Sequence, residues 1–139
     1  MQVDLLTTAQ IDRNWDAIVE MLAPALKHDP EFDTDGLYGR LMDRSTLLFH
    51  GSEGAEGLLV VSVDDEGGDL IASTIAIAGR FTGGPKQRLS LMRQGIRAIE
   101  DVARIAGCKA HRICGRDYSR FFPDYRRFEG ARNGLEKRL

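Results

Sequence analysis

Apolar side chains near the start of the chain follow first a strand-like and then a helical spacing. Residues 3–6 predict a short strand. Thr8 is the predicted N-cap of a helix that runs to about His28, and Pro24 is expected to kink this helix or to start a new turn. The apolar positions of the helix recur in steps of three and four residues: Ile11, Trp15, Ile18, Met21, Leu22 and Leu26.

The middle of the chain changes from helical spacing to a period of two. Residues 33–45 predict a second, short helix with Leu37 and Leu41 on its buried side. Apolar and β-branched segments then alternate with segments rich in glycine and acidic residues, which is typical of an antiparallel meander. The predicted strands are residues 46–50, 57–63 and 70–78, and the predicted turns are residues 51–57 and 64–69.

A long amphipathic helix is predicted for residues 86–106, with Gly107 as its C-terminal stop. Residues 110–114 predict a further strand. The apolar side chains of the helix again recur in steps of three and four, as expected for a helix packed on a sheet: Leu89, Met92, Ile96, Ile99, Ala103 and Ala106.

The end of the chain predicts two small elements. A short helix is expected to begin at residues 118–122 and to be limited by Pro123, and a last strand is expected within residues 130–139. Antiparallel hairpins combined with one strand–helix–strand unit predict an α+β fold with a mixed central sheet flanked by helices. The length of the chain predicts a single domain over residues 1–139.

Composition narrows the class of protein without identifying a function. Hydrophobic residues make up 42% and charged residues 29% of the chain, which is ordinary for a globular protein. The longest apolar runs, residues 58–63 and 70–79, are too short to span a membrane. The first eight residues lack a basic segment followed by an apolar core, so we expect no signal peptide and a cytoplasmic site of synthesis.

The cysteines and histidines predict no disulfide and no metal site. Cys108 and Cys114 would lie too far apart along one strand to bridge, so reduced, partly buried thiols are expected, with a catalytic role as the lesser alternative. The histidines at positions 28, 50 and 111 show no spacing typical of metal ligands.

Charge is distributed unevenly along the chain. Residues 80–139 contain 15 Lys and Arg against 6 Asp and Glu, whereas residues 1–79 contain 4 against 15. A basic half suggests a polyanionic partner, such as a cofactor phosphate, nucleic acid or the acidic surface of another subunit. The simpler alternatives are that the two halves attract each other within one fold, or that the arginines form a solvated face.

A glycine-rich basic segment, GRFTGGPKQR at residues 79–88, connects a predicted strand to the long helix. Such a turn places backbone N–H groups and a helix N-terminus where they can hold a phosphate. The alternative is a simple turn followed by Pro85, because proline is favourable at the first position of a helix.

The order of elements resembles the GCN5-related N-acetyltransferase (GNAT) superfamily over nearly the whole chain. In that family the corresponding loop holds the pyrophosphate of coenzyme A and carries the signature Arg/Gln-x-x-Gly-x-Gly/Ala. Arg80 and Gly83 match this signature, whereas Pro85 departs from it and removes an N–H donor. For an active enzyme the resemblance implies acetyl-CoA as cofactor, bound by the loop residues Arg80, Thr82, Gly83, Gly84 and Lys86.

The resemblance also implies a catalytic tyrosine and a general base, and both are hard to place. The family pattern Leu-Tyr-x-x-x-Gly-Phe puts Pro123 at the position of the tyrosine, although Tyr118 and Tyr125 lie nearby. The alternative is that Tyr118 and its neighbours Phe121 and Phe122 are core aromatics. The strands offer no mid-strand carboxylate as base, only these polar side chains: His50, Ser62, Ser73 and Thr74.

The last third of the chain resembles small phage and prophage proteins with a GNAT-like fold. The matching motifs are Ala-Arg-x-x-Gly-Cys at residues 103–108, Gly-Arg-x-Tyr at 115–118 and Leu-x-Lys-x-Leu at 135–139. Residues 15–26 fit the same group. Some related proteins travel inside the virions of short-tailed phages.

Two functional hypotheses therefore compete. The sequence favours a non-catalytic, virion-associated component without a bound cofactor, which contacts assembly proteins through its acidic and basic halves, with nonspecific contact to nucleic acid as a further option. Such a protein would be found in the host cytoplasm or in the virion. The alternative is an acetyl-CoA-dependent N-acetyltransferase, in which Tyr118 or Tyr125 acts as the acid.

Overall fold

The computed structural model describes residues 2–27, 33–52, 55–81 and 83–139, with the side chains of Ala55 and Phe81 left out. The strands and helices along these residues are β1 Gln2–Leu5, α1 Thr8–Arg13, α2 Trp15–Leu26, α3 Thr34–Met42, β2 Thr46–Ser52, β3 Ala55–Glu66, β4 Asp69–Phe81, α4 Pro85–Ile105, β5 Ala110–Ile113, β6 Arg126–Arg127 and β7 Leu135–Arg138.

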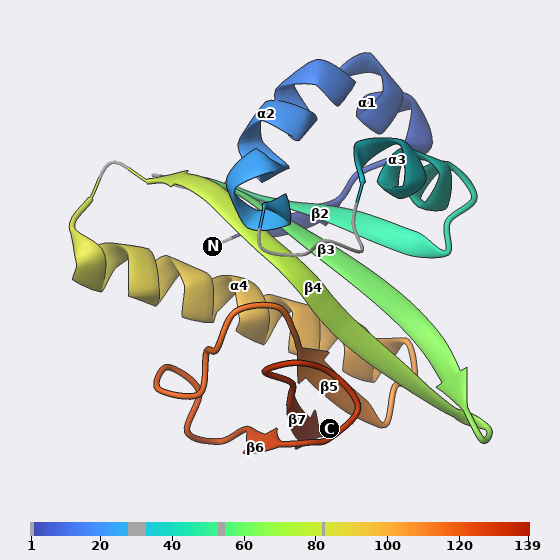
Figure 1. Ribbon diagram of the computed structural model, residues 1–139, viewed down its shortest axis with the longest axis vertical. Helices are drawn as coiled ribbons and strands as arrows, with labels where there is room; N and C mark the ends of the chain where they lie inside the picture. The colour runs from blue at the N-terminus through green and yellow to red at the C-terminus, as the bar shows by residue number, and fades with distance from the viewer. Residues whose placement is uncertain (1, 28–32, 53–54, 82) are drawn as a thin grey trace.

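The strands form one twisted sheet in the order β1-β2-β3-β4-β5-β7-β6. All neighbours are antiparallel except β4 and β5, which are parallel and joined through α4. Figure 1 shows α1, α2 and α3 on one face of this sheet and α4 on the other. The predicted α+β fold with a mixed central sheet flanked by helices is confirmed.

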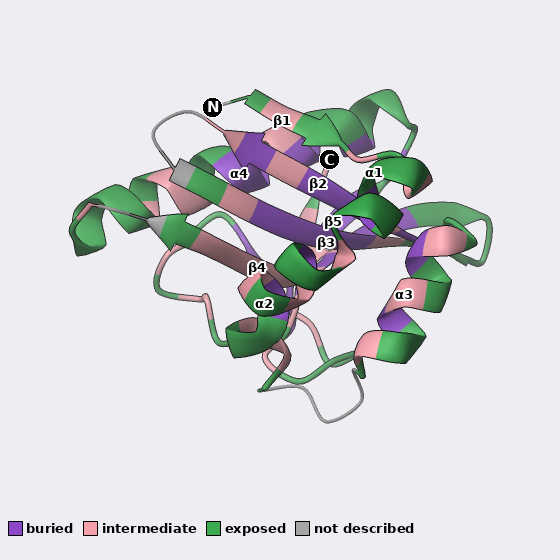
Figure 2. Cartoon of the chain, turned by 90° about the horizontal axis from the view of Figure 1, so that it is seen from above, coloured by how far each residue is buried: buried purple, intermediate pink, exposed green. Residues whose placement is uncertain are grey.

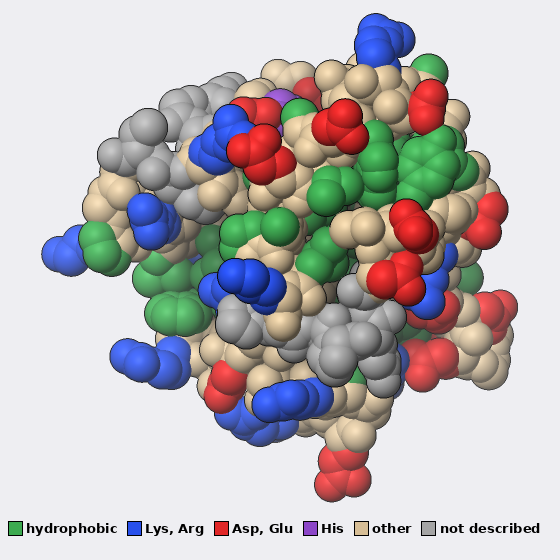
Figure 3. Space-filling view, turned by 45° about the horizontal axis from the view of Figure 1, so that its top comes forward, with side chains coloured by type: hydrophobic (Ala, Val, Ile, Leu, Met, Phe, Trp, Pro, Cys, Tyr) green, Lys and Arg blue, Asp and Glu red, His purple; other side chains and the backbone are tan. Residues whose placement is uncertain are grey.

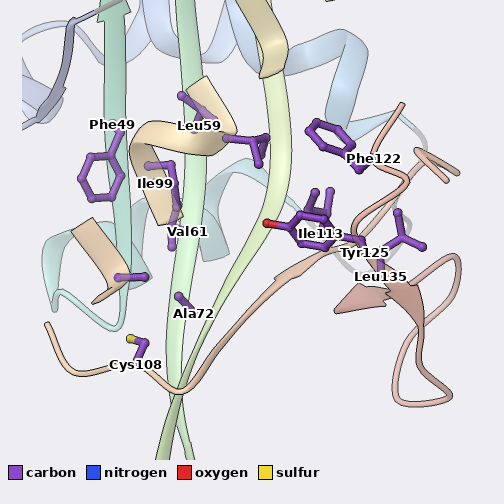
Figure 4. Packing of buried hydrophobic residues seen from close by; sticks show 12 residues of the cluster. Phe49, Leu59, Val61, Ala72, Ile99, Cys108, Ile113, Phe122, Tyr125 and Leu135 are labelled. Atoms are coloured by element: carbon purple, nitrogen blue, oxygen red, sulfur yellow. The ribbon is translucent and has the colours of Figure 1, made fainter. Parts of the chain in front are cut away.

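Each face of the sheet has its own hydrophobic core, because successive side chains of a strand point to opposite faces. Leu48 and Leu58 pack beneath α1–α3, while Phe49 and Leu59 face α4. Figure 2 shows buried residues along β2 and β3 beneath the three N-terminal helices. Figure 4 shows the second core, in which Cys108 and Tyr125 pack with aliphatic residues.

The first helix begins one residue earlier than predicted and ends much sooner. Thr7, not Thr8, is the N-cap, because its hydroxyl accepts the Gln10 N–H while the Gln10 side chain accepts the Thr7 N–H. This reciprocal pair is a capping box. The chain then leaves helical geometry at Asn14, which separates α1 from α2. Pro24 lies inside α2, and the predicted end at His28 falls outside the described residues.

The predicted helix at residues 118–122 is wrong. The Phe121 N–H donates to the Tyr118 carbonyl and the Tyr125 N–H to the Phe122 carbonyl, which makes two successive tight turns. Pro123 has no N–H to continue a helix. These turns lead into β6, a two-residue strand that the sequence pattern does not reveal.

The β3–β4 hairpin is longer than predicted. Its turn contains only Gly67 and Gly68, which both have positive φ angles, 64° and 97°. Two such residues match the twist of a tight hairpin. The acidic residues predicted as turn belong to the strands, since Glu66 pairs with Asp69. Figure 1 shows the hairpin tip projecting beyond the other elements.

No helix within the described ranges combines the length and the apolar character that a membrane span requires.

The predicted stop at Gly107 is confirmed in detail. Gly107 has a φ of 86°, its N–H donates to Arg104, and the Cys108 N–H donates to Ala103. These two bonds close the C-terminal end of α4 as a Schellman motif, which requires a left-handed residue.

Gly107→Ala is expected to lower the free energy of unfolding by about 1–2 kcal/mol, because an L side chain disfavours the left-handed conformation. Gly39→Ala is the matched control. Gly39 lies in α3, and a Cβ added there would meet no atom within 4 Å, so alanine should raise stability by up to about 1 kcal/mol. Urea unfolding of both variants measures the two changes, and equal signs would contradict this account.

Candidate functional site

β4 and β5 separate in the middle of the sheet. They pair in parallel over four residues, and the last bond runs from the Cys114 N–H to the Thr74 carbonyl. At this point β4 contains a bulge, since Val61 pairs with Thr74 and Val60 with Ala76. The extra residue, Ile75, locally bends the strand.

The chain after β5 turns away from β4 at Gly115. Gly115 has a φ of 103°, and its carbonyl accepts a hydrogen bond from the Asn133 side chain. The second half of β4 therefore pairs with β3 on one edge and has no strand partner on the other edge within the described residues. A free edge presents unpaired N–H and C=O groups.

This separation opens a cavity of about 650 Å³ between β4, α2, the start of α4 and the segment after β5. The floor is mostly apolar, and three cationic side chains lie among the lining residues. Figure 3 shows hydrophobic side chains flanked by Lys and Arg on the left of the view, whereas Asp and Glu predominate on the right. The lining residues are Met21, Pro24, Ala25, Ile77, Ala78, Gly79, Pro85, Lys86, Arg88, Leu89, Met92, Arg116, Tyr118 and Phe121.

The three cations of the cavity are Lys86, Arg88 and Arg116. All three are exposed, and none forms an ion pair with any residue that the structure describes. Lys86 and Arg88 lie in the first turn of α4, where the helix dipole adds positive potential. The mouth of the cavity is thus suited to an anionic group.

Only some of the residues predicted to hold the cofactor line this cavity. Lys86 lines it, and Pro85 starts α4 as predicted, with Gly84 as N-cap. Arg80 lies on β4 with its guanidinium 3.8 Å from Glu20 of α2, and it does not line the cavity.

The loop itself is compact. A Cβ added at Gly83 would collide with the Gln87 side chain, 1.6 Å from its amide oxygen and 2.8 Å from its Cβ. Neither Gly83 nor Gly84 lines the cavity, and Thr82 falls outside the described residues. Phosphate binding by these three residues stays a prediction. The cavity cations that the sequence did not single out are Arg88 and Arg116.

The two tyrosines proposed as acids have different environments. Tyr118 is half-buried and lines the cavity, and burial raises the pKa of its phenol. Tyr125 is buried in the core (Figure 4), and its hydroxyl donates to Glu100 at 2.5 Å. Of the two tyrosines, only Tyr118 lines the cavity. Phe122 is a core aromatic as expected, and Tyr118 and Phe121 pack against the same core while they also line the cavity.

Tyr125 belongs to a buried chain of hydrogen bonds that the sequence does not reveal. Thr74 Oγ1 lies 2.7 Å from His111 Nε2, and His111 Nδ1 lies 2.7 Å from the Tyr125 hydroxyl. The hydroxyl in turn donates to Glu100, which also accepts from Arg97 at 2.6 Å and from Lys137 at 3.1 Å. We call Thr74, His111, Tyr125 and Glu100 the buried relay.

The protonation states follow from the contacts. Tyr125 donates its proton to Glu100, so its oxygen accepts from His111 Nδ1, and Thr74 donates to Nε2. Burial lowers the pKa of His111 to about 4, which keeps the ring neutral near pH 7. Burial opposes ionisation of Glu100, but hydrogen bonds from Tyr125, Lys137 and Arg97 hold the pKa of its carboxyl below the usual value.

The candidate bases are divided between the relay and the opposite face of the sheet. Thr74 bonds to His111, and Ser62 lies 3.2 Å from the Thr46 hydroxyl. His50 Nε2 lies 3.4 Å from a carboxylate oxygen of Glu56. Glu56 lies on β3, so the prediction that it belongs to a turn is wrong: the strand starts earlier because residues 55–57 pair with β4. Ser73 is half-buried on β4.

The cysteines are free thiols, with Cys108 buried and Cys114 half-buried at the separation point. Burial raises the pKa of both thiols. No cluster of three His, Cys, Asp or Glu side chains suited to a metal ion occurs in the part of the chain that the structure covers.

Comparisons place this fold among acetyltransferases of known structure. A probable acetyltransferase aligns with a TM-score of 0.63 at 12% identity, over 81% of this chain and 78% of the other. An aminoglycoside acetyltransferase from an uncultured soil metagenomic sample, solved in complex with sisomicin, aligns with a TM-score of 0.60 at 17% identity, over 88% of this chain and 82% of the other. Tetrahymena GCN5 aligns with a TM-score of 0.61 at 10% identity, over 100% of this chain and 96% of the other. No protein-family model and no curated protein sequence matches the chain. At these identities the likeness establishes the GNAT fold.

The pKa of His111 predicts how stability depends on pH. Its value falls from 6.5 in the unfolded chain to about 4 in the fold, so the unfolded state binds a proton first on acidification. Stability from this group is fully present above pH 6.5 and is expected to fall by up to about 3 kcal/mol as the pH drops to 4. Urea unfolding at several pH values measures the slope.

His111→Gln should flatten the slope between pH 6.5 and 4. Thr74→Val is the matched control, because it removes one relay bond but keeps the imidazole. That variant should lose stability at every pH and retain the slope. If the free energy of unfolding of His111→Gln falls between pH 6.5 and 4 as steeply as that of the original chain, the pH dependence does not come from His111.

Proposed function

We propose that the protein is an acyl-coenzyme A-dependent N-acyltransferase, with acetyl-CoA as the expected donor. The observation that carries this proposal is the separation of β4 from β5 at Ile75, which opens a cavity with an apolar floor and a cationic mouth beside the N-terminus of α4. The structural similarity to acetyltransferases supports it. Fold alone does not fix function, so the site must carry the argument.

The cavity residues fit coenzyme A in charge and polarity. Lys86, Arg88 and Arg116 would hold its phosphate groups, because unpaired cations form charge-assisted hydrogen bonds to phosphate. The apolar floor around Met92 suits the less polar arm of the molecule, and the free edge of β4 offers backbone hydrogen bonds to its amides. Pro85 removes one N–H donor from the loop, so the side-chain cations carry more of the binding.

The reaction joins an acyl carbon to an amine nitrogen. One C–N bond forms, the thioester C–S bond breaks, and an ammonium substrate yields an amide, a thiol and one released proton. Tyr118 is the side chain suited to protonate the leaving sulfur, because it lines the cavity and its phenol, whose pKa is raised by burial, carries its proton near pH 7 as tyrosines ordinarily do.

The enzyme hypothesis has more support than the virion-associated component that the sequence favours. The similar structures are acetyltransferases, and none of them is described as a phage protein. The basic half also has internal roles, because Arg80 contacts Glu20 and Arg112 lies 2.6 Å from Glu66. Contacts with assembly proteins or nucleic acid stay predictions.

Charge reversal at the cavity mouth tests cofactor binding. Arg88→Glu is expected to weaken acetyl-CoA binding at least about tenfold, because it replaces an attractive charge by a repulsive one. Isothermal titration calorimetry measures the dissociation constant. Arg132→Glu is the matched control, an exposed arginine of the same basic half that does not line the cavity.

Arg80→Glu separates the structure-based assignment from the loop signature. If Arg80→Glu weakens binding more than Arg88→Glu does, the signature residues hold the phosphates and the assignment to the cavity cations is wrong. Absence of binding at millimolar acetyl-CoA would overturn the enzyme proposal itself.

Tyr118→Phe is expected to lower turnover about 100-fold while acetyl-CoA affinity stays within about twofold, since a positioned general acid contributes to the transition state. Tyr125→Phe should instead lower the free energy of unfolding by about 1–3 kcal/mol, because it leaves buried partners unpaired. Kinetics and urea unfolding of both variants separate the roles. Full turnover in Tyr118→Phe would exclude it as the acid.

A further inference from the structure

The side of α4 that faces the segment after β5 carries a row of cationic and polar side chains. Lys86, Ser90, Arg93 and Arg97 recur in steps of three and four residues, so they lie on one side of the helix. They line a shallow hollow of about 590 Å³. The Arg93 Nε donates to the Phe121 carbonyl at 3.0 Å, which places this row beside the turns after β5.

The segment after β5 adds two cations to the same side of the molecule. Arg116 and Arg120 are both exposed. Arg116 lines the larger cavity together with Phe121, and the Arg120 guanidinium lies 6.0 Å from the centre of the Phe121 ring. Cations therefore lie on both sides of the seam between α4 and this segment.

The hollow and the larger cavity adjoin along this seam. Lys86 and Leu89 line both of them. Arg93 of the hollow is bonded to Phe121, which is part of the cavity lining. The cations around the two recesses thus form one continuous patch. We call this patch the cationic surface; it consists of Lys86, Arg88, Arg93, Arg116 and Arg120.

The charges of the cationic surface are not neutralised by the fold. None of its five side chains forms an ion pair with a residue that the structure describes. The acids beside it are held by other cations: Asp101 by Arg104, Asp117 by Arg127, and Asp124 by Arg97 and Lys137. The surface is therefore suited to a partner that carries several negative charges.

The side chains between the cations favour a phosphate backbone over an acidic protein. Backbone phosphates are contacted by arginine, lysine, serine and glutamine side chains and by helix N-termini, and the hollow offers these groups in Arg93, Ser90, Gln94 and the first turn of α4. A protein partner requires an apolar core at its interface. The large hydrophobic side chains that are exposed in the described residues do not line the hollow; they are Leu5, Val63, Leu70, Val102 and Ile105.

The shape of the cationic surface favours a single strand over a duplex. A backbone that contacts all five cations must bend from the hollow into the mouth of the cavity, whereas a duplex is stiff over a length of about 50 nm. Tyr118 and Phe121 are half-buried and line the cavity between the cations. Aromatic rings beside a basic groove allow unpaired bases to stack.

We propose that the cationic surface binds single-stranded nucleic acid through its phosphate backbone, without recognising the base sequence. This function is additional to the proposed transferase and does not depend on it. Lys86, Arg88 and Arg116 line the cavity and would contact either ligand, so the strand and acetyl-CoA are expected to compete. Arg93 and Arg120 do not line the cavity and would contact the strand alone.

The test measures the fluorescence anisotropy of a labelled, mixed-sequence single-stranded DNA of about 12 nucleotides with the full chain. Five phosphate contacts predict that the logarithm of the association constant falls with the logarithm of the salt concentration with a slope of about −3.5. A duplex of the same sequence and an oligoglutamate of the same length are the comparison probes. Each is expected to bind about tenfold more weakly, because neither has an unpaired base to stack.

Arg120→Gln and Arg93→Gln are each expected to weaken binding of the strand about three- to tenfold and to make the salt slope shallower by about 0.7. Acetyl-CoA affinity should stay within about twofold in both variants. Arg120 donates no hydrogen bond to a described residue, so its variant keeps the test valid if Arg93→Gln disturbs the turn at Phe121. Arg13→Gln is the matched control, an exposed arginine of α1 on the other face of the sheet, and should bind the strand as the original chain does.

The inference is overturned if the duplex or the oligoglutamate binds as tightly as the single strand, or if Arg13→Gln weakens binding as much as Arg120→Gln. Calorimetric titration of acetyl-CoA into the original chain separates the two proposals. If acetyl-CoA binds and the strand does not, the inference is wrong while the proposed function stands. If the strand binds and acetyl-CoA does not, the cationic surface stands as a nucleic-acid site and the proposed transferase fails.

Discussion

The buried relay from Thr74 to Glu100 fixes the point at which β4 and β5 separate. It joins β4, β5, the turns after β5, and α4, and Lys137 extends it to β7. No buried side-chain nitrogen or oxygen among the described residues lacks a hydrogen-bond partner. A fully satisfied buried network is rigid, and removal of one member leaves its neighbours unpaired at a cost above the net value of one bond. A slip of one residue between β4 and β5 would place Thr74 and His111 on opposite faces of the sheet and break the relay.

The separation opens a cavity in an otherwise continuous sheet. Beyond Thr74 the bulge at Ile75 bends β4, and Gly115 turns the segment after β5 away from β4. A mostly apolar cavity therefore forms between β4 and the segment after β5. The cations of residues 80–139 fall into two groups. Arg97 and Lys137 pair with Glu100 and Asp124 and stabilise the relay, whereas Lys86, Arg88 and Arg116 remain available at the cavity mouth. The basic half of the chain therefore contains cations that stabilise the fold and cations that form no ion pair with the described residues.

Local patterns predict most of the regular elements, because helices and strands bury one side at a fixed period. The amphipathic spacing of α4 and the glycine at its end are examples in which sequence and structure agree closely. The predicted helix at residues 118–122 fails because tertiary bonds, such as that from Arg93 to the Phe121 carbonyl, favour turns that the local spacing does not reveal. The prediction that Glu56 lies in a turn fails because flanking glycines obscure the start of β3. The hydrogen bonds of the relay join residues that lie 14 to 37 positions apart in the sequence. Arg116 and Lys86 come from distant segments and line the same cavity. No local sequence pattern could therefore reveal the relay or the cationic lining of the cavity.

Pro85 shows how the site differs from a backbone phosphate cradle. At the first position of α4 its missing N–H costs the helix nothing, because that group has no partner within the helix, and the ring preorganises the first turn. The same residue withdraws a donor from any phosphate at the loop. Backbone donors are fixed in direction, whereas Lys86, Arg88 and Arg116 are exposed charges on long side chains, whose attraction is screened by salt. Under the proposed function, recognition at this site depends on the charge of the ligand more than on its fit to the loop. The same proposal places selectivity in the apolar floor of the cavity rather than in the glycine-rich turn.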